Sequence, residues 1–301
     1  MIYDLCFAWN WEYDADFAAL LAAACLQQKV SLLQVTPANL GEMLQAILAG
    51  DLGCRVFFDR ASDDDPAFLP LVEWAHQHDI LRVNGYHRSR RAHNKAANHF
   101  NLIQAGLNTP YGMILPAYAE QPEIPEDDLG PLGMPFTIKP AHGGGGIGVI
   151  TGATSWEQVL SARLEYPDDQ YLLQAQVDPI LLEGRPAWFR VIFCTGQVYP
   201  FWWDTRTHVY GLVSEEQAHQ FGLHPLWKLA ASIANIVDLE LFSTEIAITP
   251  CGEYTVVDFV NDPMDLRLQS KTADGIPDGV VAGLAGRLAE FVRQTGSVIP
   301  R

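Results

Sequence analysis

Short apolar runs alternate with segments of helical periodicity along roughly the first 85 residues of the chain. Alternation of this kind is typical of a parallel sheet with helices on both of its faces. The strands end where residues such as Thr36 and Pro37 interrupt the apolar runs. We therefore predict strands at residues 2–8, 30–35, 54–58 and 80–83. The predicted helices are one capped by Asp14 or Asp16, one capped by Asn39 and one that begins at residues 63–66.

The turn after the first predicted strand, residues 8–14, reads AWNWEYD. It contains no GxGxxG sequence, so the dinucleotide-binding fingerprint of such units is absent. Open α/β sheets bind ligands beyond the C-terminal ends of their strands, which is where this aromatic loop lies. The unit is expected to shape a substrate cleft or a dimer face. Aromatic packing against a neighbouring domain explains the loop at least as well.

The pattern changes after residue 86. A helix is predicted over residues 94–105 with Gly106 at its C-terminal end, and Pro110 begins an extended segment. Residues 117–131 are polar and rich in proline and acids, which indicates a surface connection. The predicted elements that follow are a strand–loop–strand at 136–150, a helix with capping-box spacing at Thr154 and Glu157 (Thr154 or Ser155 being the cap), and a strand at 171–177.

Hairpins and helices make up the remainder, which predicts an α+β arrangement distinct from the first unit. The predicted strands lie at 187–194, 197–202, 242–249 and 253–259, and the helices at 225–236 and 280–293. The fold class is therefore α/β followed by α+β. We expect three parts: an N-terminal α/β domain (1–87), a central subdomain with a glycine-rich loop (88–175) and a C-terminal subdomain (176–301).

The composition of the 301 residues, 49% hydrophobic and 18% charged, is that of a globular enzyme. The longest apolar run, residues 17–26, is far shorter than the about 20 residues of a membrane span, and no signal peptide is visible. Five dispersed cysteines without a CxxC pair favour a reducing, cytoplasmic location over a structural zinc site. A net charge of −17 argues against nucleic acid as a partner.

Residues 136–150, FTIKPAHGGGGIGVI, place Lys139 just before a loop of nearly bare backbone. Glycine lets backbone N–H groups approach an anion, and a lysine adds a point charge suited to phosphate. The stretch predicts a mobile cover over a nucleotide triphosphate, with an ordinary glycine-rich hairpin as the alternative. Lys95 lies in the first turn of its predicted helix, which is unfavourable for the helix dipole. It indicates a partner anion, unless it is a solvated lysine.

Glu245 and Asp258 stand on two predicted antiparallel strands, and the short turn between the strands brings them close to register. Like charges that face each other favour a hard divalent cation between them, Mg²⁺ or Mn²⁺. Asn261 supplies a further oxygen just beyond the strand. The alternative is a pair of strand carboxylates on a solvated face, which the apolar neighbours argue against.

The order of these features resembles the ATP-grasp superfamily, and is similar to its glutathione synthetase type and to its enzymes that modify a ribosomal protein. The resemblance rests on NKAANHFNLIQAGLNTPYGMIL, FTIKPAHGGGGIGV, YLLQAQV, WFRVIFCTGQVYP and VVDFVNDP, and it spans roughly residues 86–290. It implies a pre-ATP-grasp domain followed by a two-lobed ATP-grasp fold. No P-loop sequence is present.

The resemblance also implies roles for individual residues. Lys95 and Lys139 would bind phosphates, and Arg190 would contact the transferring phosphate, which makes Arg190 and Lys139 the catalytic residues. Glu183 is a further candidate for the ribose hydroxyls. The backbone groups implied for nucleotide binding are those of Gly143, Gly144, Gly145, Gly146 and Gly148 over the phosphates and of Gln174, Ala175, Gln176 and Val177 at the adenine. Ala175 stands where the family commonly has glutamate, but the contacts there are largely main-chain.

For the metal, the resemblance matches Glu245 to the family's first metal carboxylate, and VVDFVNDP to the family's E-x-N ending, with Asp258 in place of glutamate. One extra residue separates Asp258 from Asn261, so Asp262 or Asp265 could take the place of Asn261 as a ligand.

The implied activity is an ATP- and Mg²⁺-dependent ligase that joins a small carboxylate to an amine through an acylphosphate. A small-molecule kinase that phosphorylates a hydroxyl and a non-catalytic nucleotide-binding module are the alternatives. The substrate is expected to be a small molecule or short peptide, and a homodimer through the N-terminal unit is a family-level expectation. Basic residues left for the substrate's negative groups are Arg267, Arg206 and Arg88, with Arg90, Arg91 and Lys271 as further candidates.

Overall fold

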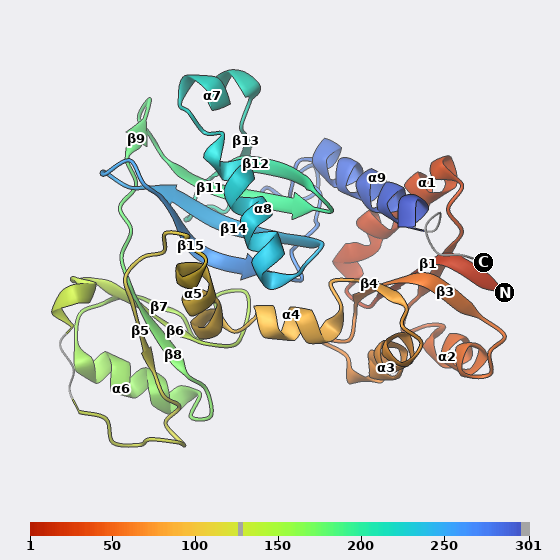
Figure 1. Ribbon diagram of the computed structural model, residues 1–301, viewed down its shortest axis with the longest axis horizontal. Coiled ribbons are helices and arrows are strands. Elements are labelled where there is room, and N and C mark those ends of the chain that lie inside the picture. Colours follow the sequence, from red (N-terminus) through yellow and green to blue (C-terminus); the bar gives the residue numbers. More distant parts are fainter. Residues whose placement is uncertain (126–128, 296–301) are drawn as a thin grey trace.

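The apolar runs of the first part of the chain form a four-stranded parallel sheet (Figure 1). The computed structural model describes residues 1–125 and 129–295. The strand order is β2-β1-β3-β4. The strands are β1 (Ile2–Trp9), β2 (Leu32–Val35), β3 (Gly53–Arg60) and β4 (Leu81–Val83). The parallel α/β unit predicted from the sequence is confirmed.

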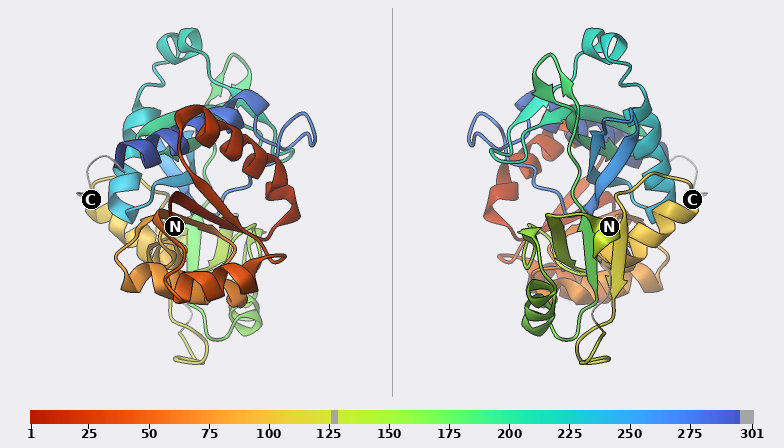
Figure 2. Two further views of the ribbon diagram at one scale, coloured as in Figure 1. Left: turned by 90° about the vertical axis from the view of Figure 1, so that its right-hand side faces the viewer. Right: turned by 90° about the vertical axis from the view of Figure 1, so that its left-hand side faces the viewer.

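Both faces of this sheet are covered by helices, because alternate residues of β1 are buried on opposite sides. Leu5 and Phe7 belong to a core with α1 (Ala15–Gln28) and α9 (Asp278–Thr295), whereas Cys6 and Ala8 belong to a core with the other helices. Those helices are α2 (Leu40–Leu48), the 3-10 turn η2 (Pro66–Phe68) and α3 (Leu69–Gln77). Figure 2 shows α1 and α9 side by side over the strands.

An antiparallel sheet of order β5-β8-β6-β7 forms the central part of the chain. The strands are β5 (Gly112–Leu115), β6 (Phe136–Pro140), β7 (Ile150–Ala153) and β8 (Tyr171–Ala175). The sheet packs against α6 (Trp156–Glu165), and the 3-10 turn η3 (Gly130–Leu132) lies in the connection before β6. Two helices lead into it, α4 (Tyr86–Ala92) and α5 (Lys95–Gln104).

The C-terminal part is a five-stranded antiparallel sheet of order β13-β12-β11-β14-β15. Its strands are β11 (Trp188–Cys194), β12 (Gln197–Trp203), β13 (Tyr210–Leu212), β14 (Leu241–Ile248) and β15 (Tyr254–Asn261). Helix α8 (Pro225–Val237) packs on one face, and α4 and α5 contact α8 in turn. Smaller elements are the hairpin β9 (Leu181–Leu182) and β10 (Arg185–Pro186), helix α7 (Glu215–Gln220) and the 3-10 turn η1 (Glu12–Asp14).

Several local predictions are corrected by the structure. Asp14 precedes α1 but does not cap it, because its carboxylate is bound by Arg60 at 2.8 Å. Asn39 likewise accepts from Thr36 N–H instead of capping α2. Of the two predicted caps of α6, Ser155 is the one that caps the helix, and it accepts from Gln158 N–H, so the pair is Ser155 and Gln158 rather than Thr154 and Glu157.

No helix within residues 1–125 and 129–295 is both long enough and apolar enough to cross a membrane.

Candidate active site

Three neighbouring strands bring an arginine and two carboxylates together on the C-terminal sheet. Arg190 on β11 lies opposite Glu245 on β14, which lies opposite Asp258 on β15. Arg190 Nη1 donates to Glu245 Oε1 at 3.1 Å, and Trp188 Nε1 donates to Glu245 Oε2 at 2.8 Å. The predicted register of the two carboxylates is therefore present. The alternative of a solvated face does not hold for Glu245, whose side chain is 15% exposed.

A β-bulge in β15 keeps Asn261 near these carboxylates. The step from Ser243 to Glu245 on β14 covers two residues, whereas the partner step from Asn261 to Asp258 covers three. Because residues two apart on a strand share a face, Asn261, which pairs with Ser243, lies on the face of Glu245. The extra residue that separates Asp258 from Asn261 is thus absorbed by the bulge.

The two alternative metal ligands are bound elsewhere. Asp262 accepts from Asn84 Nδ2 at 2.6 Å and also from the Ser89 hydroxyl. Asp265 pairs with Arg267 at 2.6 Å. Asn261 therefore stays the predicted third ligand.

A second irregularity in β15 joins the two antiparallel sheets. Between the pairs Glu245–Asp258 and Ile246–Val256, Val257 has no register partner. Its carbonyl lies 3.4 Å from Lys139 Nζ and 3.3 Å from Gln174 Nε2, and both side chains donate to it. Lys139 comes from β6 and Gln174 from β8. The Val257 carbonyl is therefore hydrogen-bonded to two strands of the central sheet, which fixes that sheet against the β14–β15 hairpin.

Lys95 lies at the same junction. Its backbone N–H donates to Ala141 O at 2.7 Å, and its ammonium donates to the carbonyl of Gly143. Burial lowers the pKa of Lys95; Lys139 lowers this pKa further, while Asp258 raises it. The predicted phosphate lysines and a predicted metal carboxylate are thus close enough to influence one another electrostatically.

The carboxylate pair has the electrostatics of a cation site. Burial raises the pKa of Glu245; the neighbouring Arg190 lowers this pKa, and the like charge of Asp258 raises it. Among the described residues no donor binds the carboxylate of Asp258. A hard divalent cation between the two groups would offset their repulsion, so these residues fit Mg²⁺ or Mn²⁺.

The protein alone supplies few metal ligands. Within residues 1–125 and 129–295, no group of three or more His, Cys, Asp and Glu side chains is placed to hold a metal ion. A cation here would have the carboxylates of Glu245 and Asp258 and the amide oxygen of Asn261. Mg²⁺ commonly binds to one or two carboxylates and completes its shell with water and substrate phosphates.

The glycine loop connects the antiparallel strands β6 and β7 and lies open. Gly143, Gly145 and Gly146 have φ of +102°, +61° and +77°, and a Cβ at any of them would have no neighbour within 4 Å. Gly148 differs, because a Cβ there would meet the ring of Tyr166 at 2.6 Å. The loop is thus a hairpin connection as well as a set of exposed backbone groups beside Lys95, and its mobility stays a prediction.

The segment after β8 has backbone groups available for a ligand. Ala175 N–H donates to Tyr111 O at 2.9 Å, but no described residue accepts from the N–H of Gln176 or Val177. Glu183 lies away from this segment, in the β9–β10 turn, where it accepts from Gln220 Nε2 at 2.7 Å. Figure 1 shows β9 close to α7 and far from β6 and β7, so the structure does not bring Glu183 to the group around Lys139.

The arginines predicted for the substrate differ in their surroundings. Arg88 pairs with Glu240 at 2.8 Å and Asp238 at 3.2 Å. Arg267 pairs with two aspartates, and Arg206 is 90% exposed. The first two cations are therefore offset within the fold, whereas Arg206 extends into solvent.

Sequence reasoning did not find the groups that hold Arg190. Its Nε donates to Ser243 Oγ at 3.1 Å, and its guanidinium lies 4.7 Å from the ring centroid of Trp203. Trp188 was missed as well, although its place two residues before Arg190 puts both on one strand face. His99 is a further buried neighbour, and burial together with Lys139 lowers its pKa.

No family model matches the sequence, and no curated protein matches it. Solved structures do match. A RimK domain protein of the ATP-grasp type from Sphaerobacter thermophilus DSM 20745 has 19% identity and a TM-score of 0.64 over 95% of this chain and 99% of its own. D-alanine–D-alanine ligase from Bacillus anthracis, complexed with ATP, has 12% identity and a TM-score of 0.62 over 98% and 99%. The D-cycloserine synthetase DcsG has 16% identity and a TM-score of 0.58 over 97% and 100%.

These likenesses extend over nearly the whole length of both chains in each pair. The chain therefore has the ATP-grasp fold, as the sequence predicted, including the N-terminal α/β unit that precedes it.

Proposed function

We propose that this protein is an ATP- and Mg²⁺-dependent ligase that forms an amide-type bond between a small carboxylate and an amine through an acylphosphate. One observation carries the proposal: Lys95, Lys139, Arg190, Glu245 and Asp258 come from five different elements and meet where the central and C-terminal sheets join. A fold alone needs no such convergence of cations and carboxylates. The ATP-grasp fold of structures described as ligases adds support.

In this proposal the central part (88–175) and the C-terminal part (176–301) enclose the nucleotide, and the N-terminal domain (1–87) borders the substrate. The N–H groups of Gln176 and Val177 would bind the adenine. Glu183 remains a weaker candidate for the ribose, since it would have to move to reach it.

The protein's own charges suit phosphoryl transfer, which depends mainly on positioning and electrostatics. Lys95 and Lys139 would bind phosphate oxygens, and the release of Lys95 from the Gly143 carbonyl would free that loop to close. Arg190 would offset charge on the transferring group, held in place by Ser243 and Trp203. The closed glycine loop would keep water from the acylphosphate until the amine attacks.

Glu245, Asp258 and Asn261 would hold Mg²⁺. When bound, the ion would neutralise phosphate charge and act as a Lewis acid. Two observations support this placement: the pKa of Glu245 is raised, and no described residue donates to the carboxylate of Asp258.

The test is a screen of ADP release with Mg²⁺ over pooled amino acids, dipeptides and hydroxy acids, with mass detection of the product. A ligase gives ADP and a condensed product only when both a carboxylate and an amine are present. Glu245→Ala and Lys139→Ala should each lower turnover by at least about 100-fold, because each removes a group that stabilises the transferring phosphate. Glu216→Gln on α7, which removes an exposed carboxylate, should leave turnover unchanged.

The same screen separates the other activities. A stable phosphorylated hydroxy compound without dependence on an amine would assign a kinase. Tight ATP binding without turnover on any pool would assign a nucleotide-binding module. Retention of full turnover in both Glu245→Ala and Lys139→Ala would reject the assigned site.

A further inference from the structure

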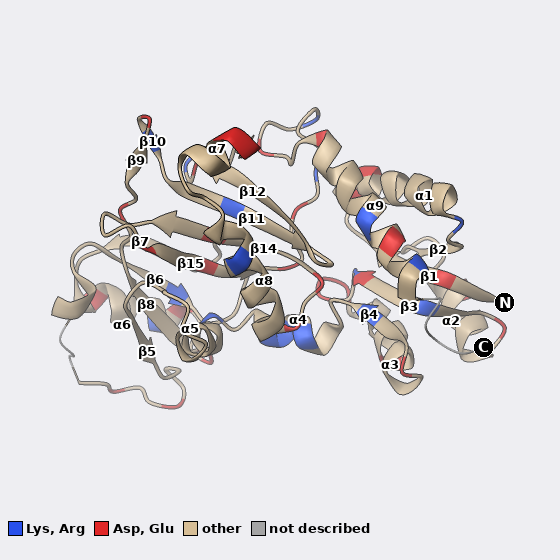
Figure 3. Ribbon diagram, turned by 45° about the horizontal axis from the view of Figure 1, so that its top comes forward, with Lys and Arg blue, Asp and Glu red and all other residues tan. Residues whose placement is uncertain are grey.

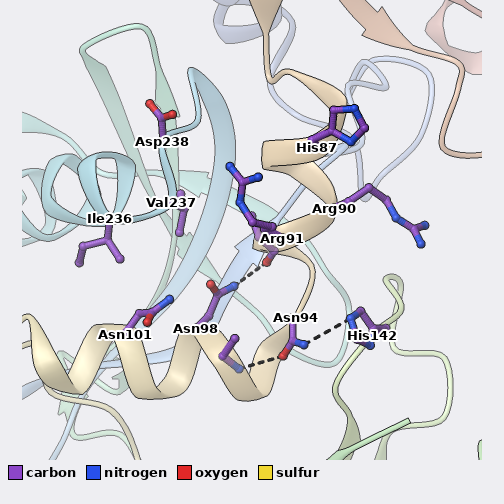
Figure 4. Close-up of a pocket in the computed structure, with 12 residues that line it drawn as sticks. His87, Arg90, Arg91, Asn94, Asn98, Asn101, His142, Ile236, Val237 and Asp238 are labelled. Atoms are coloured by element: carbon purple, nitrogen blue, oxygen red, sulfur yellow. Dashed lines mark hydrogen bonds between the residues drawn. The ribbon is translucent and has the colours of Figure 1, made fainter. Parts of the chain in front are cut away.

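A cavity of about 590 Å³ lies between α4, the first turns of α5 and the end of α8 (Figure 4). None of Lys139, Arg190, Glu245 and Asp258 lines it, so it is distinct from the proposed nucleotide site. Small-molecule sites commonly have volumes of about 300–1,000 Å³. The cavity therefore has the size of a ligand site that the proposed ligase activity does not use.

Two arginines at this cavity have side chains without a partner among the described residues. Arg90 and Arg91 line it from the last turn of α4, where both are exposed, and neither guanidinium group forms an ion pair or hydrogen bond within residues 1–125 and 129–295. Figure 4 shows Arg91 extending on the side of Val237 and Arg90 on the side of His142. Figure 3 shows α4 as a basic segment in a chain whose net charge is −17. Unpaired guanidinium groups on either side of one cavity favour an anion within it.

The other walls are compatible with an anion. Asp238 is the one carboxylate among the residues that line the cavity, and its Oδ1 lies 3.2 Å from Arg88 Nη1. Because Arg88 also pairs with Glu240, the charge of Asp238 is offset in part. Asn98 is held by a hydrogen bond from Nδ2 to Ala92 O. Asn101 lines the cavity one turn further along α5, and no described residue binds its side-chain amide. Its N–H groups are therefore available as donors beside the arginines.

One edge of the cavity leads to the glycine loop. His142 lines the cavity and directly precedes Gly143. Its Nδ1 lies 2.8 Å from Asp169 Oδ1, and its Nε2 lies 3.3 Å from Asn94 Nδ2. An occupant of the cavity would thus contact a residue fixed to the loop that covers the proposed nucleotide site.

We propose that this cavity binds a small dianion, whose carboxylate or phosphate groups are held by Arg90 and Arg91 with the amide of Asn101 as a further donor. A guanidinium group binds either kind of anionic group through two parallel hydrogen bonds. The cavity is open to solvent on one side, and its volume of about 590 Å³ fits a small molecule. The proposal does not depend on the proposed ligase activity.

The test is calorimetric titration of the full chain at low ionic strength with citrate, pyrophosphate or sulfate, in the absence of Mg²⁺ and nucleotide. We expect saturable binding at one site for at least one of the three probes. Tighter binding of citrate would identify a carboxylate ligand, and tighter binding of pyrophosphate a phosphate ligand. The double variant Arg90→Gln/Arg91→Gln should weaken the affinity by at least about tenfold, because charge-assisted hydrogen bonds are lost.

Two further variants distinguish this cavity from other anion sites. Lys29→Asn/Lys228→Gln removes the same total charge at positions that do not line the cavity and should change the affinity less than twofold. Lys139→Ala removes a phosphate residue of the proposed nucleotide site and should also leave the binding intact. The proposal is overturned if no probe binds saturably, if the lysine pair matters as much as the arginine pair, or if Lys139→Ala abolishes the binding while the arginine pair does not.

Discussion

Trp188 is a positioning residue for Glu245, and its role can be tested at the level of a single hydrogen bond. Burial raises the pKa of Glu245, whereas the bond from the Trp188 indole lowers it. Mg²⁺ binds only the ionised carboxylate, so its binding weakens as the pH falls through the raised pKa of Glu245, which lies above the about 4.3 of an exposed glutamate. In Trp188→Phe the pKa of Glu245 should rise further, so Mg²⁺ binding should begin to weaken at a higher pH.

The measurement is the Mg²⁺ concentration that gives half-maximal binding of a non-hydrolysable ATP analogue, recorded as a function of pH. The Trp188→Phe curve should be displaced toward higher pH relative to that of the unmodified protein. Trp227→Phe, which changes a half-buried tryptophan of α8, should not displace it. If the curves of all three proteins coincide, the hydrogen bond from the Trp188 indole does not affect the pKa of Glu245.

At the scale of an element, the bulge in β15 predicts that Asn261 and Asp262 behave differently although they are adjacent. Asn261 lies on the face of Glu245, so Asn261→Ala should weaken Mg²⁺-dependent binding of the ATP analogue. Asp262 is bound by Asn84 and Ser89, so Asp262→Ala should lower the free energy of unfolding by about 1–3 kcal/mol through unsatisfied partners.

The two variants are compared by calorimetry with Mg²⁺ and by chemical denaturation. Asp262→Ala should retain the Mg²⁺ dependence of the native protein at temperatures where it is folded. The reverse result, a metal effect at Asp262 and none at Asn261, would mean that the bulge does not orient Asn261 toward the carboxylates.

The glycine loop should exchange its amide hydrogens rapidly without nucleotide and slowly with it. Open surroundings at Gly143, Gly145 and Gly146 leave few contacts to restrain the loop. Hydrogen exchange with and without the ATP analogue and Mg²⁺ measures this. The Thr195-Gly196 turn between β11 and β12 serves as an internal control and should not respond. Slow exchange of the loop in the free protein would contradict its role as a mobile cover.

How much of these elements the sequence predicts depends on whether local patterns determine them. The hairpin β14–β15 is predictable, because a short turn fixes which residues face each other, and Glu245 and Asp258 are indeed paired. The bulges are not predictable, because they depend on packing against neighbouring strands rather than on a sequence signal. For α6 the sequence left Thr154 and Ser155 as alternative caps, since both have suitable side chains, and Ser155 is the cap in the structure.

The ion pairs of the predicted substrate arginines differ in how far apart their members lie along the chain. Arg88 pairs with Glu240, which is 152 residues away, so no local pattern indicates this partner. Arg267 pairs with Asp265 and Asp274, which are two and seven residues away, so these partners were within reach of a local reading. The residues predicted for the nucleotide come from short motifs whose order along the chain resembles a family, and their role stays a prediction.

At the scale of the whole molecule, the N-terminal sheet and α9 share one hydrophobic core. Leu284 and Leu288 of α9 are buried in the same cluster as Leu5, Phe7 and Phe17. Leu288→Ala should therefore lower the free energy of unfolding by about 2–5 kcal/mol, because it leaves a cavity between distant parts of the chain.

Chemical denaturation measures this loss, with Leu164→Ala as the matched control. Leu164 is 57% exposed on α6, so its truncation should cost far less. Equal effects of the two substitutions would mean that α9 does not stabilise the N-terminal unit.

The packing of α1 against α9 also affects how the chain folds during its synthesis. A ribosome releases α1 early and α9 only after both antiparallel sheets have been synthesised. Until then the face of the N-terminal sheet that carries Leu5 and Phe7 lacks part of its cover. Closing so long a loop is entropically slow. The nascent chain therefore carries an exposed apolar surface through most of its synthesis, which favours the binding of chaperones to this part of the chain until α9 covers it.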